Sequence, residues 1–264
     1  VIYDRNGMIL AENKTAFQLE LIPEQVTDID DSLMRLSNLG LIGNESINSI
    51  KMKIQKSQQF KPVTIRTSLT DNDIAEFAVN MPNFSGINLQ PRLIRSYPYS
   101  EATSHVVGYL GAVSKSDLIK LNRSSYDPNE KIGKTGSELF NEDHLHGVPG
   151  FNQFIANARG REIPIKTDSI FLEKKPPEPG SNIYLTVDLE LQKLATELLG
   201  GRKGAVVAID PNNGEILSLV SSPAFNPNIF SNTLTTHQFN ELQSNENQPL
   251  FNRAVLGTYS PGST

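Results

Sequence analysis

The spacing of apolar residues predicts a mixture of strands and helices over the first 175 residues. Apolar and polar residues alternate at 17–22 and 62–67, as they do in strands with one buried face. Two short apolar runs flank Asn6-Gly7, a dipeptide typical of tight hairpin turns. Further helices are predicted at 30–39, at 45–58, from Thr70 with Asp73 as its capping partner, and at 116–121 and 136–145, with a short helix or turn at 102–109. Further strands are predicted at 87–94, 151–158 and 162–171.

A proline-rich stretch at 174–180 interrupts these patterns. It contains three prolines and a glycine, which neither a helix interior nor a central strand accommodates. We therefore expect a domain boundary here, with one domain at 1–175 and a second at 176–264.

The pattern changes after this boundary. A strand is predicted at 183–186, and Asp188 then caps a helix. The run at 205–209 is continuously apolar and predicts a strand buried on both faces, followed by a turn, a returning strand at 215–220 and a later helix at 236–242. The predicted apolar stripe of the first helix consists of Leu191, Leu194, Ala195 and Leu198. These elements are the beginning of an α/β domain, too few to cover a sheet on both faces. The whole chain is thus expected to be α+β.

Composition excludes several classes of function. The 264 residues carry a net charge of −5 with a pI near 5.5, which argues against a nucleic-acid partner. No stretch approaches the roughly 18–20 apolar residues of a membrane span. The absence of cysteine excludes disulfides and thiolate catalysis. His144 and His146 would diverge on a helix and have no evident third ligand, so we predict neither a metal nor a cofactor.

Ser263 is the candidate catalytic residue. Pro261-Gly262 breaks the chain, and Ser263-Thr264 would then begin a helix. A serine there meets unpaired backbone N–H groups at the positive end of the helix dipole. That position suits either a helix cap or a nucleophile whose product is an oxyanion.

Several segments together resemble the class B penicillin-binding proteins, and specifically their elongation-type members. Ser263 stands where that family places the nucleophile of its Ser-x-x-Lys motif, in which the lysine takes the serine proton. The other matching segments, in chain order, are Asp4-Arg5-Asn6-Gly7 with Leu10-Ala11, Leu69-Thr70 with 77–80 and Gly86, Tyr97-Pro98-Tyr99 with 105–109, 132–138 with 145–147 and Gly150, Asn157 with 159–161, 184–189 with Gln192, 204–220, 222–228 and 252–254.

The resemblance implies a non-catalytic pedestal domain of the dimerisation type, followed by the opening part of a serine β-lactamase-like transpeptidase domain. It implies a serine-type D-Ala-D-Ala transpeptidase or carboxypeptidase that cross-links peptidoglycan stem peptides and is acylated by β-lactams. Rod-shape scaffold proteins and a glycan-polymerising membrane protein are the implied partners. The implied location is the periplasmic side of the bacterial inner membrane, with a single-pass anchor that this sequence does not contain.

The same resemblance assigns structural roles to Arg5, Gly7, Gly133 and Glu138. It implies that Glu138 forms an ion pair within the pedestal, with Arg5 as the suggested partner. Lys134-Thr135-Gly136 and Ser46-Ile47-Asn48 spell the later transpeptidase elements, but they precede the serine and are interpreted as pedestal structure.

Two alternatives stay open from the sequence. No serine of the chain has a lysine three residues later, so we expect the polypeptide to be inactive by itself. It would then act as a docking module, with Ser263 as a helix cap. Within the enzyme class, a division-type relative is the second possibility.

Overall fold

The computed structural model describes residues 1–43, 46–114, 117, 130–153, 155, 157, 173–231, 234 and 236–258. The chain forms two compact units, each built from segments distant in sequence. The first unit comprises Val1–Asn13, Arg95–Pro149 and Pro177–Thr264, and the second comprises Lys14–Ile94 and Gly150–Pro176. Each unit contains more than one segment of the chain, so the two units are not separated at a single residue. The predicted domain boundary at residue 175 stays a prediction.

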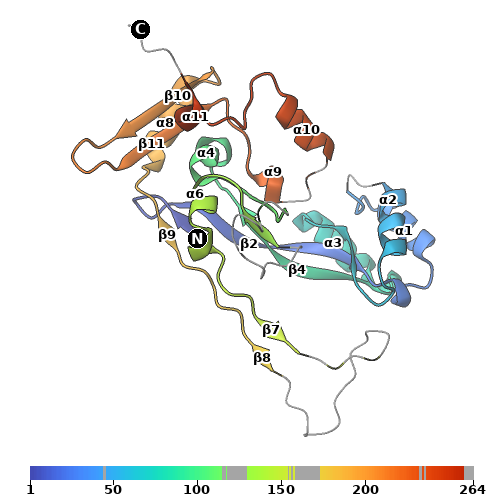
Figure 1. Ribbon diagram of the computed structural model, residues 1–264. Coiled ribbons are helices and arrows are strands. Elements are labelled where there is room, and N and C mark those ends of the chain that lie inside the picture. Colours follow the sequence, from blue (N-terminus) through green and yellow to red (C-terminus); the bar gives the residue numbers. More distant parts are fainter. Residues whose placement is uncertain are drawn as a thin grey trace. The chain divides into compact units, whose positions relative to one another are not determined.

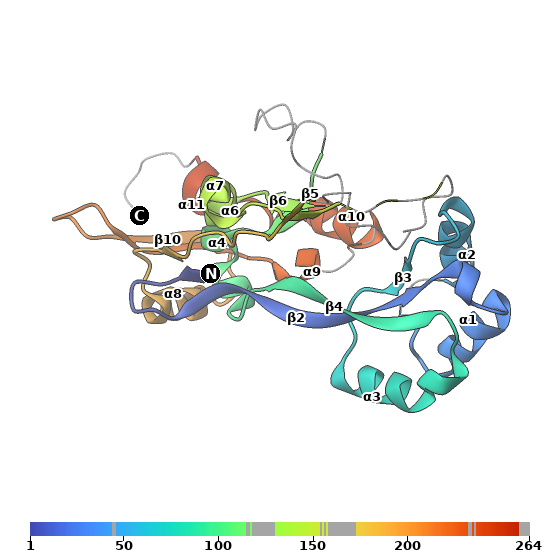
Figure 2. The ribbon, with the colours of Figure 1, turned by 90° about the horizontal axis from the view of Figure 1, so that it is seen from below.

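In its described residues, the second unit contains α-helices and short 3-10 helices beside a sheet. Its strands β2 (Ile9–Leu21) and β4 (Ile87–Ser96), which begin or end in the first unit, run side by side, and β3 (Val63–Arg66) pairs antiparallel with β2 (Figures 1 and 2). Its other elements are η1 (Pro23–Gln25), α1 (Ile29–Asn38), α2 (Ile47–Lys56), α3 (Asp71–Asn80), η2 (Met81–Asn83), β7 (Phe151–Asn152) and β8 (Lys174–Lys175). The predicted helices at 30–39 and 45–58 and the strands at 62–67 and 87–94 are confirmed.

The core of the second unit is formed by the faces that the sequence pattern marks as apolar. Leu33 and Leu36 of α1 and Ile50 of α2 are fully buried. At the start of α3, Thr70 and Asp73 form the predicted capping box, and Asp73 also pairs with Arg66 of β3 at 2.7 Å. The local capping signal and the long-range packing therefore place α3 consistently.

The first unit is organised around a short hairpin. Strand β1 (Ile2–Tyr3) pairs antiparallel with the start of β2, and Gly7 in the connecting turn has a φ of +83°. Strand β9 (Ile183–Tyr184) joins the other side of β1 in parallel. The remaining elements are η3 (Ser100–Thr103), α4 (Ser104–Val107), β5 (Leu110–Ala112), β6 (Lys131–Gly133), α6 (Gly136–Phe140), α7 (Glu142–Leu145), α8 (Leu189–Leu199), β10 (Gly204–Ile209), β11 (Ile216–Ser222), α9 (Asn228–Ser231), α10 (Thr236–Ser244) and α11 (Arg253–Leu256).

Helix α8 packs on the antiparallel β10–β11 hairpin, with α11 on the hairpin as well (Figure 1). Asp188 caps α8, as predicted, by accepting bonds from the backbone N–H groups of Glu190 and Leu191. The helix ends at Gly200, which has a left-handed φ of +56°.

Three details of the sequence prediction are wrong. The predicted helix at 136–145 is two short helices, α6 and α7, which are separated at Asn141. Strand β10 is not buried on both faces, since Val207 is 44% exposed and Ile209 is 56% exposed. The apolar stripe of α8 is also displaced. Leu194 and Leu198 are exposed, whereas the polar Gln192 is buried because its amide is fully hydrogen-bonded.

Some expectations fall on residues that the structure does not describe. These are Ser263, the segment 159–161, the predicted strand at 162–171 and most of the predicted helix at 116–121. The predicted strand at 151–158 is shorter among the described residues, where it is limited to β7 (Phe151–Asn152), and residues 154, 156 and 158 are not described. Within the described residues, no helix combines the length and the apolar character needed to cross a membrane.

Candidate functional site

Ser263 itself lies outside the described residues, but the chain that leads to it is described as far as residue 258. Helix α11 begins at Arg253 and is capped by Asn252, whose side chain accepts from the N–H of Ala254 at 3.1 Å. Ser221 at the end of β11 holds the start of this helix. Its Oγ accepts from the N–H of Arg253 at 2.9 Å and donates to the carbonyl of Phe251 at 3.1 Å. The approach to the candidate nucleophile is thus fixed to β11.

Glu138 forms a buried ion pair, but its partner differs from the one suggested by the resemblance. Its Oε1 lies 2.7 Å from Nε of Arg95, and the two side chains are 1% and 7% exposed. Arg5 instead lies 3.4 Å from Glu215, in a pair that is about two-fifths exposed on the arginine side. The suggested Arg5–Glu138 pair is therefore wrong. Arg95 follows the strand pattern of β4, so sequence alone did not distinguish it from a solvated flanking residue.

Tyr97 completes this buried cluster. Its hydroxyl donates to Oε1 of Glu138 at 3.2 Å and accepts from the N–H of Leu110 at 3.2 Å. Burial raises the pKa of Glu138, while the adjacent Arg95 guanidinium opposes that shift. Burial also raises the pKa of Tyr97, so the phenol stays protonated and able to donate. The cluster joins β4, the start of β5 and α6 of the first unit.

Gly133 allows β6 to approach α6 closely beside this cluster. A Cβ atom on Gly133 would lie 2.3 Å from the backbone carbon and oxygen of Glu138. The N–H of Gly133 donates to Oε2 of the buried Glu142 at 2.8 Å, and Nδ1 of His146 lies 3.0 Å from the other oxygen of that carboxylate. Glu142 and His146 thus serve to connect β6 with the segment of α7.

The turn at Asp4-Arg5-Asn6-Gly7 is connected to the start of α8. Asp4 is completely buried, and its Oδ1 accepts from the N–H groups of Asn6 and Met8 at 2.8 and 2.7 Å. Its Oδ2 accepts from the N–H of Leu189 at 3.2 Å, so one carboxylate supports both the turn and the N-terminus of α8. The backbone N–H of Arg5 donates to Val187. Asp4 was part of the matching motif, but its position within it did not reveal this second role.

Gln192 is a further residue whose role the sequence did not indicate. Its Nε2 donates to the carbonyls of Ala102 and Leu219 at 2.8 and 2.9 Å. Its Oε1 accepts from Ser218 Oγ and Leu219 N–H at 3.0 and 2.8 Å. A buried amide with all four positions satisfied fixes η3, α8 and β11 to one another. Its polar character had excluded it from the predicted apolar face.

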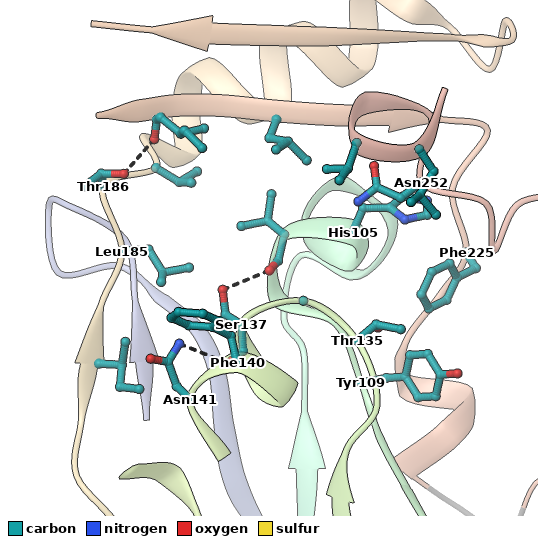
Figure 3. A pocket seen from close by; sticks show the side chains of 18 of the residues that line it. His105, Tyr109, Thr135, Ser137, Phe140, Asn141, Leu185, Thr186, Phe225 and Asn252 are labelled. Carbon is teal, nitrogen blue, oxygen red and sulfur yellow. Dashed lines mark hydrogen bonds between the residues drawn. The ribbon is translucent and has the colours of Figure 1, made fainter. Parts of the chain in front are cut away.

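A cavity of about 870 Å³ lies within the first unit, next to these elements (Figure 3). Its wall is mostly apolar, and none of the residues that line it is an aspartate, glutamate, lysine or arginine. The hydroxyl of Ser137 donates to Val106 at 2.9 Å, and that of Thr186 donates to Ile216 at 2.8 Å, so these polar groups are used internally (Figure 3). His105, Tyr109 and Phe225 form an aromatic end of the cavity.

Two family models match the chain in order. The penicillin-binding protein dimerisation domain matches residues 1–185, and the penicillin-binding protein transpeptidase domain matches residues 204–264. The chain therefore belongs to the penicillin-binding proteins that carry a dimerisation domain followed by a transpeptidase domain. The α+β fold class and the resemblance drawn from the sequence motifs are confirmed.

Within this family, the chain is similar in sequence to proteins named peptidoglycan D,D-transpeptidase. The peptidoglycan D,D-transpeptidase MrdA of Escherichia coli is 37% identical over 268 residues, covering all of this chain and 41% of the relative. MrdA of Acinetobacter baumannii is 38% identical over 263 residues, covering all of this chain and 38% of the relative. The chain thus spans about two-fifths of the length of these curated relatives.

A solved structure shows the same fold. In the complex between penicillin-binding protein PBP2 and MreC from Helicobacter pylori, the matching chain is 27% identical, with a TM-score of 0.72. The match covers 96% of this chain and 46% of that one.

Proposed function

We propose that this chain is the pedestal and the opening part of the catalytic domain of an elongation-type peptidoglycan D,D-transpeptidase. The observation that carries the proposal is the ordered match to both domains, with the second match extending across Pro261-Gly262-Ser263-Thr264. The name shared by the MrdA relatives supplies the reaction.

In this proposal, Ser263 is the nucleophile. Its Oγ attacks the carbonyl carbon between the two terminal D-Ala residues of a stem peptide, the peptide bond breaks, and the last D-Ala leaves with a proton on its amine. The resulting ester is then attacked by an amine of a neighbouring stem peptide, which forms the cross-link and releases Ser263. A β-lactam acylates the same oxygen through opening of its ring amide. The base in this mechanism is a lysine three residues after Ser263, at a position that follows Thr264.

The described residues contribute support to this site. Ser221, Asn252 and Arg253 fix the described chain that precedes Ser263 in the sequence, and Asp4 and Gln192 fix α8 to the N-terminal turn and to β11. We propose a periplasmic location with the membrane anchor outside this sequence.

The test is covalent labelling with a fluorescent penicillin, followed by gel electrophoresis and intact mass. Three proteins are compared: this chain, the chain extended by its natural C-terminal sequence, and the extended chain with Ser263→Ala. Labelling of the extended protein that disappears in Ser263→Ala supports the proposal. A folded extended protein that is not labelled contradicts it.

A second candidate function is docking by the pedestal. The observation in its favour is the Helicobacter pylori structure, in which a related protein is in complex with MreC. We propose that this chain binds a rod-shape scaffold protein of that kind, and that a glycan polymerase of the membrane is a further partner. Calorimetric titration of the chain with the soluble domain of its own organism's scaffold protein tests this. Absence of heat at micromolar concentrations with a folded chain contradicts it.

A further inference from the structure

Arg253 binds several backbone carbonyl groups of one loop. Its Nη2 donates to the carbonyl of Asn247 at 2.6 Å, and its Nη1 lies 3.1 Å from that of Gln248 and 3.4 Å from that of Phe251. The residue is only 8% exposed, and its guanidinium lies 5.8 Å from the centre of the Phe251 ring. A planar cation with several fixed donors holds carbonyl groups in one geometry, which a lysine cannot reproduce. The loop 247–251 is therefore closed around this side chain.

His105 of α4 reaches the same loop from another side. Its imidazole is hydrogen-bonded to the backbone of Pro249, and because proline has no N–H, the group involved is the carbonyl. Nε2 of His105 is buried and has no hydrogen-bond partner among the described residues, so the donor to Pro249 is Nδ1. The edge of the Phe225 ring packs against the imidazole, with the ring centres 5.3 Å apart.

Burial and the positive charge of Arg253 favour the neutral imidazole. Together they lower the pKa of His105 to about 4, with burial as the larger cause. A neutral imidazole carries one N–H, and that proton is committed to the Pro249 carbonyl. His105 thus acts as a fixed donor rather than as a general base.

Arg253, His105 and Ser221 all bind the backbone between residues 247 and 253, which precedes Ser263 in the sequence. Arg253 is the first residue of α11 and precedes Ser263 by ten residues in the sequence. Ser221 binds the backbone on both sides of Asn252, through Phe251 and Arg253. A displacement of the loop 247–251 would therefore also move the start of α11.

We propose that Arg253 is a positioning residue for acylation at Ser263, and that Ser221 and His105 assist it by fixing the same loop. The proposal deepens the proposed transpeptidase function and rests on it. In this role Arg253 touches neither the substrate nor the reacting atoms. It acts by holding the loop 247–251 and the start of α11, ten residues before the serine in the sequence.

The experiment measures the rate of acylation per active site in the extended, full-length protein. A fluorescent penicillin in large excess gives a first-order labelling rate constant, and the plateau gives the fraction of active protein. Loss of folded protein lowers the plateau and leaves the rate constant unchanged. Misplacement of the serine lowers the rate constant, so the two roles are separated.

The principal variant is Arg253→Lys, which keeps the charge and loses the planar fork. We expect its rate constant to fall roughly 10- to 100-fold, because ångström-scale misplacement of reacting groups has effects of that size. The matched control is Arg202→Lys. Arg202 also donates to two backbone carbonyls, those of Leu199 and Leu198, but it is exposed and lies three residues after the end of α8. The rate constant of Arg202→Lys should stay within about a factor of two of the parent, because this substitution is not expected to move the reacting groups.

His105 provides a second measurement if Arg253→Lys does not fold. His105→Gln retains an N–H donor, whereas His105→Phe fills the aromatic site without one, so the glutamine variant should label faster than the phenylalanine variant. Unchanged rate constants in Arg253→Lys and in His105→Phe would overturn the inference. If the parent protein itself is not labelled, or if its labelling persists in Ser263→Ala, the proposed function has failed rather than this inference.

Discussion

The side-chain amide of Asn228 exchanges two hydrogen bonds with the backbone of Tyr97. The N–H of Tyr97 donates to Oδ1, and Nδ2 donates to the carbonyl of Tyr97, both at 2.9 Å. Tyr97 is the first residue after β4, whose backbone pairing ends at Ser96. A side chain more than 130 residues away in sequence thus provides the pairing that a neighbouring strand would otherwise give.

Substitutions of Asn228 should destabilise the chain. Asn228→Asp removes the donor and places a charge against the Tyr97 carbonyl, and Asn228→Ala removes both bonds. We expect a loss of about 1–3 kcal/mol in the free energy of unfolding for each, because a partly buried N–H or carbonyl is left unpaired. Urea unfolding followed by circular dichroism measures it. Asn212→Ala is the control, since Asn212 lies in an exposed turn and its side chain bonds to the nearby Asp210. Equal losses in Asn228→Ala and Asn212→Ala would contradict a stabilising role for the Asn228–Tyr97 hydrogen bonds.

Removal of Glu138 should be far more costly than removal of Arg5. Glu138→Ala leaves the buried Arg95 without its counter-ion, a change that costs about 3–5 kcal/mol for buried pairs. Arg5→Ala breaks a partly exposed pair with Glu215, which we expect to contribute about 1 kcal/mol or less. The melting temperatures of the two variants give the comparison. A Glu138→Ala protein that melts like the parent but no longer binds its partner would show that Glu138 serves docking instead.

Gly133 and Gly7 should respond differently to alanine, although the resemblance assigned both a structural role. Gly133→Ala places a methyl group 2.3 Å from the backbone of Glu138, so β6 and α6 must separate. Gly7→Ala meets nothing within 4 Å, and only the strain of its left-handed φ opposes it. We expect about 1–2 kcal/mol for Gly7→Ala, and a larger loss or failure to fold for Gly133→Ala. Expression and thermal melting test the order, and Gly7→Asn should recover part of the loss because asparagine tolerates this conformation.

His105 should make the chain less stable in mild acid. Its folded-state pKa of about 4 lies below the ordinary histidine value of about 6.5. At pH values between these two pKa values, the unfolded chain binds more protons than the folded chain. The free energy of unfolding therefore falls as the pH falls. We expect this effect of His105 to lower the free energy of unfolding by on the order of 2 kcal/mol at pH 5.

The comparison of His105→Gln with the parent isolates this contribution. Melting temperatures at pH 7 and pH 5 should differ less in His105→Gln than in the parent, because the variant has no imidazole to protonate. His237→Gln serves as the control, since it makes the same substitution at a histidine that is 81% exposed. A parent-like pH dependence in His105→Gln would show that another group governs the acid response.

Local signals were sufficient for most individual elements. The capping box at Thr70 and Asp73, the Asp188 cap and the Asn6-Gly7 turn each depend on residues within four positions of one another, and all three are present. Such short-range chemistry is legible in a sequence because its geometry is set by the backbone of one turn.

Long-range partners were not predictable in the same way. Arg95 and Glu138 are 43 residues apart, and nothing in the spacing of either distinguishes a buried partner from a solvated one. Gln192 was missed because a polar residue is buried only when specific donors and acceptors meet it, here from Ala102, Ser218 and Leu219. The family motif identified Glu138 as important, and the structure supplied its partner.

The parallel pairing of β1 with β9 has a consequence for how the chain folds. Ile2 meets Ile183, so the first unit cannot complete this pairing until a segment 181 residues away has arrived. The second unit draws most of its residues from the continuous stretch Lys14–Ile94. Contacts between distant segments form slowly, because the entropy of closing the loop is lost before the contact is gained. Hydrogen-exchange labelling during refolding should therefore protect Leu33 and Ile50 before Ile2. During synthesis from the N-terminus, β1 stays unpaired on that side until β9 has been made, and until then it is an exposed strand edge.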